Sequence, residues 1–290
     1  MSDEIVFING KYLPLKEASV SILDRGFTLG DGLFETLRAY GGHIFRSEDH
    51  LDRLFESSNK IFLKIPHDKE KLNQIINDVL KKNNLKEAYV RLTVTRGEGP
   101  PGLALPKNTC PTVVVYATQA FSLPNDYYNS GVKVSTFPRS ATSTTTISPQ
   151  IKSCNYLSQI IIRELANQDN AFEGILLEDD QTVTEGTVSN IFIVKDGVLK
   201  TPCLSRFILP GVTRKIILEL ASQNNLPYEE TKITTEDIRQ ADELFIANTG
   251  IEILPVSKVD TTQIGNGSIG NITTFLQNSL LKLIEDLRKK

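Results

Sequence analysis

The sequence has few cysteines and histidines, and neither type is grouped as a disulfide framework or a metal site requires. Its three cysteines, Cys110, Cys154 and Cys203, stand far apart, and no Cys-x-x-Cys pair occurs. This spacing excludes a disulfide-rich scaffold and favours reduced thiols in a cytoplasm. The three histidines lack the close spacing of metal ligands, so we expect no metal site.

The chain also lacks an excess of charge of one sign and any long hydrophobic run. Its 32 basic and 35 acidic residues give a net charge of −3, so nucleic acid is not an expected partner. The longest apolar runs, such as 5–8 and 112–117, have the length of strands and are too short to cross a bilayer. The acidic start MSDEIVF is not typical of a signal peptide. We therefore expect a cytoplasmic protein that does not associate with membranes.

Glycine-rich nucleotide-binding motifs are absent as well. No GxGxxG follows a predicted strand and no GxxxxGK[ST] occurs, which leaves nucleotide cofactors without support. Internal repeats and low-complexity tails are also missing. With 290 residues, 40% hydrophobic and 23% charged, the composition is that of a globular protein long enough for two domains. An enzyme is the expected class at this size.

Short strands and amphipathic helices alternate along residues 1–121, which we interpret as a small α+β domain. The predicted elements are a hairpin turning at Asn9-Gly10, a hairpin over 34–45 turning at Gly41-Gly42, helices over 47–63 (with Ser47 as N-cap) and 68–83, and strands over 88–96 and 111–119. Asn-Gly favours a type I′ turn because both residues tolerate positive φ.

The composition changes over 122–130, which indicates a linker before a larger domain at 131–290. The elements predicted there are a strand at 131–137, a Ser/Thr-rich loop at 139–150, a helix at 155–168, strands at 172–178, 181–186 and 187–194, a turn at Asp196-Gly197, a helix at 213–223, a strand at 243–248 and a helix near 271–288. The apolar residues of the helix at 155–168 that we expect to face a core are Leu157, Ile160, Ile161 and Leu165. Clean βαβ units are few, so the predicted fold class is α+β.

Lys152 stands where the Ser/Thr-rich stretch meets the helix predicted over 155–168. A partly desolvated amine at such a junction is a nucleophile that can form a Schiff base. A lysine taken alone is more often a solvated surface residue. By itself the residue is therefore a weak indication of covalent chemistry.

Six stretches of the sequence, taken in order, resemble the class IV (fold-type IV) pyridoxal-phosphate aminotransferases. This family includes branched-chain amino-acid aminotransferases, D-amino-acid aminotransferases and aminodeoxychorismate lyases. The stretches are DRGFTLGDGLFETLR (24–38), HLDRL (50–54), IKSCNYLSQIIIRELA (151–166), EGTVSNIFIVKDGVLKTP (185–202), LSRFILPGVTRKIILELA (204–221) and FIANTGIEILPV (245–256). The resemblance covers nearly the whole chain. It implies a small α/β domain, a larger cofactor-binding domain with a mixed sheet or pseudo-barrel like that of D-amino-acid aminotransferase, and a homodimer.

The resemblance implies pyridoxal 5′-phosphate as the cofactor and gives each matched residue a role. Lys152 holds the cofactor as an internal aldimine and moves the proton between Cα and C4′. Glu185 matches the carboxylate beside the pyridine nitrogen, where a buried anion keeps that nitrogen protonated. Tyr156 matches a tyrosine near the ring hydroxyl. Without the family, Glu185 reads as a surface residue and Tyr156 as a packed aromatic.

The cofactor phosphate requires positive charge and backbone donors. The resemblance assigns Arg53 to it, since a guanidinium suits a dianion. The first helical amides after Gly211, from Val212 and Thr213, point toward an anion at the positive end of the helix dipole. The remaining matches are the hydroxyls of Thr213 and Thr249 at the phosphate and Leu209 under the ring. If the family resemblance is disregarded, these residues are interpreted as helix caps, core residues and surface residues.

The substrate class is less well marked. The loop TRGEGPPGLALP (95–106) has Pro101 and Leu103 where D-amino-acid aminotransferases carry a carboxylate-binding arginine and histidine, and where many lyases carry Arg and Tyr. Branched-chain enzymes have an aromatic-x-Arg pair, which Tyr89 and Arg91 match. The other candidate substrate residues are Leu29 and Phe34, as an apolar wall, and the amides of Gly250 and Ile251, for the substrate carboxylate.

We therefore expect an aminotransferase that moves an amino group between an apolar, branched-chain amino acid and a 2-oxo acid. Two alternatives stay open: an aminodeoxychorismate lyase that releases pyruvate and 4-aminobenzoate, and a D-amino-acid aminotransferase. A cofactor-free scaffold is disfavoured because Lys152, Glu185 and Arg53 are all present.

Overall fold

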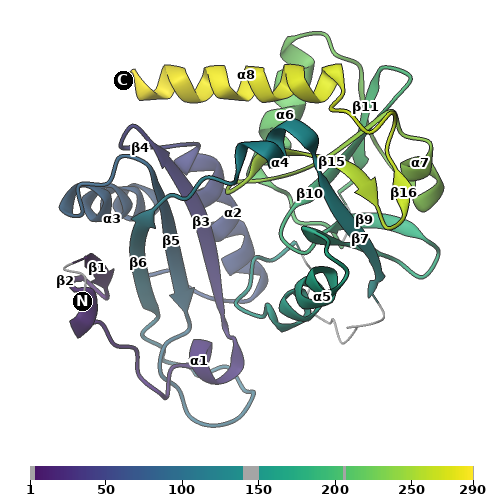
Figure 1. Ribbon diagram of the computed structural model, residues 1–290. Coiled ribbons are helices and arrows are strands. Elements are labelled where there is room, and N and C mark those ends of the chain that lie inside the picture. Colours follow the sequence, from purple (N-terminus) through teal and green to yellow (C-terminus); the bar gives the residue numbers. More distant parts are fainter. Residues whose placement is uncertain (1–3, 140–149, 205–206, 290) are drawn as a thin grey trace. The chain divides into compact units, whose positions relative to one another are not determined.

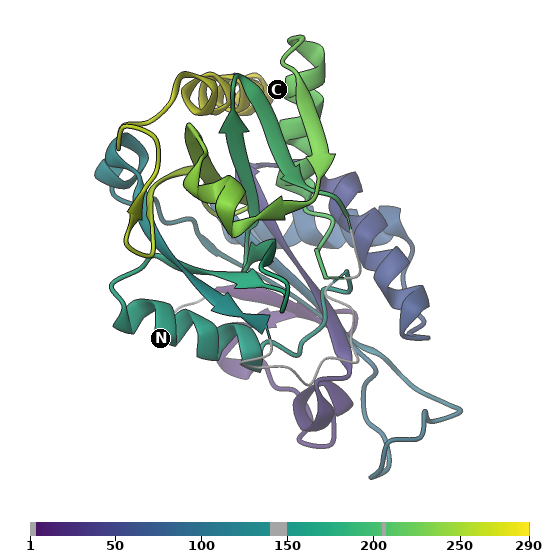
Figure 2. The same ribbon diagram turned by 90° about the vertical axis from the view of Figure 1, so that its right-hand side faces the viewer.

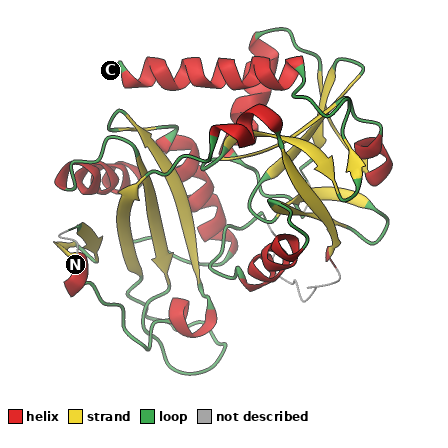
Figure 3. Cartoon of the chain, viewed as in Figure 1, coloured by secondary structure: helices red, strands yellow, loops and turns green. Residues whose placement is uncertain are grey.

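A computed structural model describes residues 4–139, 150–204 and 207–289, which form two compact units. The first unit comprises Met1–Phe121, Ile151–Asn155 and Ile284–Lys290, and the second comprises Ser122–Gln150 and Tyr156–Leu283. Each unit mixes helices and strands (Figure 3), as the predicted α+β class requires. Lys152 belongs to the first unit, although we expected it in a domain over 131–290.

The first unit contains a six-stranded antiparallel sheet with the strand order β2-β1-β6-β5-β3-β4. Its elements are β1 (Ile5–Ile8), β2 (Lys11–Pro14), a 3₁₀ turn (Leu15–Glu17), α1 (Arg25–Leu29), β3 (Gly32–Tyr40), β4 (His43–Ile44), α2 (Ser47–Lys60), α3 (Lys69–Lys82), β5 (Ala88–Thr95) and β6 (Thr112–Gln119). Helices α2 and α3 pack on this sheet (Figure 1). The hydrophobic core lies between these helices and the sheet.

Local sequence explains these elements. Asn9 and Gly10 both have positive φ, as a type I′ turn requires. Strand β5 alternates fully buried residues with half-buried ones that include Tyr89 and Arg91, the pattern of a strand with one face on the core. The side chain of Asp68 caps α3 by accepting from the Lys71 N–H at 2.7 Å. The N-cap of α2 is Arg46 rather than Ser47, and no side chain caps it.

The second unit contains a ten-stranded mixed sheet with the order β12-β11-β10-β14-β15-β7-β8-β9-β13, and β16 pairs with β15. Its elements are α4 (Asn125–Ser130), β7 (Val132–Pro138), α5 (Leu157–Gln168), β8 (Glu173–Leu177), β9 (Thr182–Gly186), β10 (Asn190–Lys195), β11 (Val198–Pro202), α6 (Val212–Gln223), β12 (Tyr228–Thr231), β13 (Ile233–Thr234), α7 (Thr235–Arg239), β14 (Glu243–Asn248), β15 (Glu252–Val259) and β16 (Thr262–Gln263). The last helix, α8 (Asn271–Arg288), belongs to this unit as far as Leu283, and its final residues belong to the first unit. In Figure 2 the green strands belong to this sheet.

Two expectations for this part of the chain need correction. Residues 122–130 contain the helix α4 and belong to the second unit, so this segment is more than a linker. Helix α5 does not bury the apolar face that we expected: Leu157, Ile160, Ile161 and Leu165 are 39–70% exposed. The buried residues of α5 are Ile162 and Ala166.

Gly174 explains the orientation of α5. A Cβ at Gly174 would contact Ile162, so the glycine lets the helix approach β8 closely along the Ile162 side. The Ser/Thr-rich loop expected at 139–150 falls almost entirely outside the described residues. Among the residues that are described, no helix combines the length and apolar character needed to cross a membrane.

Candidate active site

Lys152 is fixed to strand β3 by backbone hydrogen bonds on both sides. Its carbonyl accepts from the Phe34 N–H at 3.0 Å, and the Cys154 N–H donates to the Gly32 carbonyl at 2.9 Å. The Nζ of Lys152 lies 4.5 Å from the centroid of the Phe34 ring. The half-buried amine is therefore placed over an aromatic surface by rigid backbone rather than by a flexible loop.

The same face of the sheet carries three of the candidate substrate residues: Phe34, Tyr89 and Arg91. The Arg91 guanidinium carbon lies 3.3 Å from the Phe34 ring centroid, so Arg91, Phe34 and Lys152 form one cluster. Tyr89, two residues before Arg91 on the same face of β5, accepts a hydrogen bond from Arg38 at 2.6 Å. Leu29 is exposed at the end of α1, on a different element from Phe34.

The opposite face of β3 carries a buried ionic cluster of Glu35, His50 and Arg53, which are 0%, 1% and 7% exposed. Arg53 binds Glu35 through two parallel hydrogen bonds, from Nε at 2.8 Å and from Nη2 at 2.7 Å. His50 Nδ1 lies 2.8 Å from Glu35 Oε2. This pairing fixes the orientation of the guanidinium that we expected to bind phosphate.

The charges of this cluster set the protonation states of its members. Burial alone would raise the pKa of Glu35, but the charge of Arg53 and the hydrogen bonds from His50 and Arg53 outweigh it and lower the pKa to about 2. Burial lowers the pKa of His50, and the carboxylate of Glu35 only partly opposes this effect. Glu35 is therefore an anion at neutral pH.

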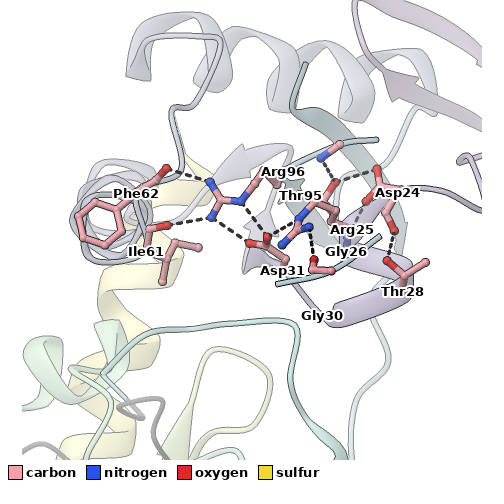
Figure 4. Close-up of polar contacts among 12 residues, drawn as sticks. Asp24, Arg25, Gly26, Thr28, Gly30, Asp31, Ile61, Phe62, Thr95 and Arg96 are labelled. Carbon is pink, nitrogen blue, oxygen red and sulfur yellow. Dashed lines mark hydrogen bonds and ion pairs between the residues drawn. The ribbon is translucent and has the colours of Figure 1, made fainter. Parts of the chain in front are cut away.

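A second ionic cluster holds the DRGFTLGDG segment in the first unit (Figure 4). Asp31 accepts hydrogen bonds from Arg25 at 2.9 Å and from Arg96 at 2.8 and 2.9 Å. Arg96 also donates to the carbonyls of Ile61 and Phe62. Arg25 donates to the Gly102 carbonyl at 2.9 Å, so this cluster ties down the loop after β5.

In the second unit, Glu185 is a buried carboxylate at the end of β9. Its Oε2 accepts from the Leu209 N–H at 2.8 Å, which joins two residues that the sequence predicted separately. Arg139 donates to the Thr184 hydroxyl and to the Phe207 carbonyl, both at 3.0 Å. Burial lowers the pKa of Arg139, and the negative charge of Glu185 opposes that effect, so the arginine and the carboxylate lie close enough to interact.

The start of α6 has an open N-terminus. Gly211 is its N-cap, and among the residues that the structure describes no side chain caps the helix. Val212 and Thr213 occupy the first turn and are buried. Asn190 packs against this turn: its Nδ2 donates to the Leu209 carbonyl at 3.1 Å, and a Cβ at Gly211 would collide with its Oδ1.

The turn between β14 and β15 carries Thr249, Gly250 and Ile251. The side chain of Asn248 accepts from the Gly250 N–H at 2.7 Å and from the Ile251 N–H at 3.0 Å. The two amides that we expected to bind a substrate carboxylate therefore already have an acceptor. Ala247 of β14 pairs with Asn190, which places this turn next to the strand that supports α6. Tyr156 is the N-cap residue of α5.

The structure thus brings the predicted residues together within each unit. Phe34, Arg91 and Lys152 meet in the first, and Glu185 meets Leu209 in the second. Sequence reasoning missed several residues that hold these groups in place: Glu35, His50, Arg139, Asn190 and Asn248. Two of them carried a signal, since Glu35 is a charge on the core face of a strand and Asn190 ends the EGTVSN motif.

Comparison with known proteins identifies relatives over nearly the entire chain. The profile of the family described as Amino-transferase class IV matches residues 32–259. A Methanocaldococcus jannaschii protein assigned to the branched-chain-amino-acid aminotransferases is 38% identical over 285 residues, covering 98% of this chain and 96% of that protein. The D-alanine aminotransferase of Staphylococcus haemolyticus is 34% identical over 280 residues, covering 97% and 98% of the two chains.

Solved structures of three similar proteins share the fold. The branched-chain aminotransferase of Escherichia coli has a TM-score of 0.92 and 29% identity, covering 98% of this chain and 95% of that one. The T.th. branched-chain aminotransferase, solved with pyridoxamine 5′-phosphate, has a TM-score of 0.89 and 26% identity, covering 99% and 96%. The 4-amino-4-deoxychorismate lyase of Pseudomonas aeruginosa has a TM-score of 0.82 and 29% identity, covering 96% and 98%.

Proposed function

Because this chain belongs to the class IV aminotransferase family of pyridoxal-phosphate enzymes, we propose that it moves an amino group from an apolar, branched-chain amino acid to a 2-oxo acid. The observation that carries this choice is the cluster of Phe34, Arg91 and Lys152. It places an apolar ring beside the reacting amine, and one guanidinium over the face of that ring.

The donor set of the chain fits the cofactor. Lys152 offers an amine to an aldehyde. Glu185 is a buried carboxylate, the partner that a pyridinium N–H requires. The uncapped start of α6 suits a phosphate, because Val212 and Thr213 occupy its first turn and Asn190 leaves no room for a side chain at Gly211.

Bound pyridoxal 5′-phosphate supplies an electron sink that stabilises negative charge at the substrate Cα. Lys152 Nζ would hold the cofactor covalently. When Nζ is not bonded to the cofactor, it would be the base that removes the substrate Cα proton and returns it. The hydrogen bonds from Phe34 and Cys154 to the adjacent backbone restrict where that amine can move.

Glu185 keeps a proton on the cofactor ring nitrogen. Its Oε2 is held by the Leu209 N–H, and the guanidinium of Arg139 lies close enough to interact with it. The backbone of Leu209 therefore orients the carboxylate, while its side chain offers an apolar contact to a flat ring. Arg53 and Thr249 are proposed to add to the binding of the phosphate.

We propose that Phe34 and Arg91 determine which amino acids and 2-oxo acids the site accepts. The ring of Phe34, which is 5% exposed in this chain, is proposed as an apolar wall that favours aliphatic side chains. Arg91 can take the second carboxylate of a dicarboxylic 2-oxo acid such as 2-oxoglutarate, since a guanidinium binds a carboxylate through two hydrogen bonds. One cluster could then serve both substrates of the two half-reactions. Tyr89, Leu29, Gly250 and Ile251 are proposed to line the same substrate.

The D-amino-acid aminotransferases are a second candidate, because one relative of that activity is 34% identical. The loop after β5 argues against it: exposed Pro101 and Leu103 stand where those enzymes carry arginine and histidine. The same two residues depart from the pattern of many lyases. An enzyme without this carboxylate trap would need other donors for the substrate carboxylate.

A panel of substrates tests the proposal directly. The purified protein, loaded with pyridoxal 5′-phosphate, is mixed with L- and D-amino acids and with aminodeoxychorismate, one at a time. We expect L-leucine, L-isoleucine and L-valine to convert the spectrum to that of pyridoxamine 5′-phosphate. Conversion by D-alanine alone, or release of pyruvate and 4-aminobenzoate, would assign the chain to another branch.

Variants assign the roles of the residues in the same assay. Lys152→Ala should lose the near-visible absorbance of the bound cofactor, whereas Lys69→Ala, at an exposed ion pair, should keep it.

Arg91→Leu should raise the KM for 2-oxoglutarate more than that for a monocarboxylic 2-oxo acid. Equal effects on both acceptors would reject Arg91 as the group that binds the second carboxylate.

We also propose that the protein works as a homodimer, as its family resemblance implies. Exposed apolar side chains support this proposal. Phe27 on α1 and Leu103 in the loop after β5 are 76% and 84% exposed. Soluble monomers rarely expose large apolar side chains in groups.

A further inference from the structure

Glu173, at the start of β8, is a fully buried carboxyl group that the proposed reaction does not use; it is 0% exposed. Its Oε1 accepts hydrogen bonds from the Val188 N–H at 2.8 Å and from the Thr187 hydroxyl at 3.2 Å. A buried carboxyl group is costly unless it is hydrogen-bonded. Both of these bonds go to one short segment, the connection between β9 and β10.

This connection wraps around the carboxyl group of Glu173. The Gly186 N–H donates to the Ser189 carbonyl at 2.7 Å, and the Thr187 N–H donates to the Gly174 carbonyl at 3.0 Å. A Cβ at Gly186 would collide with the Ser189 hydroxyl and press on the Glu173 carboxyl. The turn at 187–189 is therefore shaped by Glu173 on one side and by a glycine on the other.

The two ends of the turn lead to two of the groups in this unit that we assign to the cofactor, Glu185 and the N-terminus of α6. Glu185 stands at one end, where its carboxylate bonds to the Leu209 N–H. Asn190 stands at the other end, where its side chain bonds to the Leu209 carbonyl and packs against Gly211 at the start of α6. A shift of the turn would therefore move both groups together.

We propose that Glu173 is a positioning residue, which fixes the turn at 187–189 and thereby sets both the carboxylate of Glu185 and the N-terminus of α6 for the cofactor. This inference rests on the proposed cofactor roles of Glu185 and α6. It adds a residue that touches neither the substrate nor the cofactor and acts through the backbone of its neighbours.

The chemistry of the contacts predicts which replacement is tolerated. Burial raises the pKa of Glu173, while the Val188 N–H, the charge of Arg163 and the neighbouring hydroxyls oppose this effect. The bonds from Val188 and Thr187 need an acceptor oxygen and not a charge. Glu173→Gln keeps such an oxygen in nearly the same shape, whereas Glu173→Leu removes it.

The test compares cofactor binding in full-length variants. The dissociation constant for pyridoxal 5′-phosphate is measured by equilibrium dialysis, and the absorbance of the bound cofactor is titrated with pH. We expect Glu173→Leu to weaken binding about tenfold and to shift the titration midpoint in the same direction as Glu185→Gln. Glu173→Gln should behave like the wild type in both measurements. Thr187→Val removes one bond to the carboxyl and should give a smaller effect of the same sign, which keeps the test available if Glu173→Leu does not fold.

Two controls separate positioning from loss of stability. Ile264→Val shortens a buried side chain in the hydrophobic core of the second unit. It should lower the melting temperature without changing the dissociation constant or the titration. The inference is overturned if Glu173→Leu and Thr187→Val behave like Ile264→Val. If Glu185→Gln itself leaves the titration unchanged, the proposed role of Glu185 fails and the inference falls with it. If only the Glu173 and Thr187 variants leave it unchanged, the role of Glu185 stands and the inference alone is wrong.

Discussion

At the scale of single residues, Glu35 shows how a strand fixes the orientation of a buried arginine. Its two carboxylate oxygens take up Nε and Nη2 of Arg53, so the guanidinium plane is held in one orientation. His50 supports the carboxylate from the same helix as Arg53. An arginine that is oriented in advance loses less conformational entropy when it binds a ligand.

Replacing Glu35 by Gln should destabilise the protein strongly. The change leaves the buried charge of Arg53 without its anionic partner, and breaking a buried ion pair in this way costs about 3 kcal/mol. Urea unfolding at pH 7 measures the free energy. Asp52→Asn, at an exposed ion pair with Lys69, is the matched control and should change little. Equal losses in both variants would mean that burial does not distinguish the two pairs.

The same carboxylate predicts how stability depends on acid. The pKa of Glu35 falls from 4.5 in the unfolded chain to about 2 in the fold, so its charge stabilises the fold fully above pH 4.5. That contribution is lost as the pH falls from 4.5 toward 2. The free energy of unfolding of the wild type should therefore approach that of Glu35→Gln over this range. A constant difference between the two proteins at all pH values would contradict the assignment.

The sequence predicted the residues that we propose for the chemistry, but it did not predict several side chains that hold them in place. Lys152, Glu185 and Arg53, which we propose for the cofactor, each lie in a stretch that resembles the family. Glu35 and Asn190 were missed because their partners are distant along the chain: Arg53 is 18 residues from Glu35, and Leu209 is 19 from Asn190. Only the strand register and the crossing of elements bring such pairs together.

At the scale of elements, local patterns predicted most helices and strands, since periodicity and turn residues act over a few positions. Which face of a helix is buried depends on the neighbouring element. Counting apolar residues gave the wrong face for α5, because the narrow contact of Ile162 with β8 relies on Gly174. That glycine comes after the helix in the chain, and nothing in the helix itself indicates it.

The start of α6 offers a test of one contact between elements. Gly211→Ala should weaken pyridoxal 5′-phosphate binding about tenfold, because the new Cβ displaces Asn190. Asn190→Ala removes the obstacle together with a hydrogen bond to Leu209. In the double variant, the alanine at 211 should therefore add little to the effect of Asn190→Ala. Strictly additive changes in the binding free energy would show that the two residues do not interact.

At the scale of the whole molecule, the ionic cluster around Asp31 fixes the position of several exposed apolar side chains in the first unit. Arg25 ties the loop after β5 to α1 through the Gly102 carbonyl, and the Gly99 N–H donates to the Leu23 carbonyl at 3.4 Å. These bonds hold the exposed side chains of Leu23, Phe27 and Leu103 in one region of the first unit. A fixed apolar surface loses little entropy when it meets a partner.

The homodimer proposal makes a prediction for this surface. The double variant Phe27→Asp, Leu103→Asp places two charges on it and should raise the dimer dissociation constant by at least about a hundredfold, since burying an unpaired charge is costly. Sedimentation equilibrium measures association. The melting temperature of the monomeric fraction should stay close to that of the wild type at equal dilution, because both side chains are exposed. Leu281→Asp, at an exposed position of α8, is the control and should leave association unchanged. A wild-type protein that sediments as a monomer at every concentration, or a double variant that still sediments as a dimer, would exclude this surface as the contact between subunits.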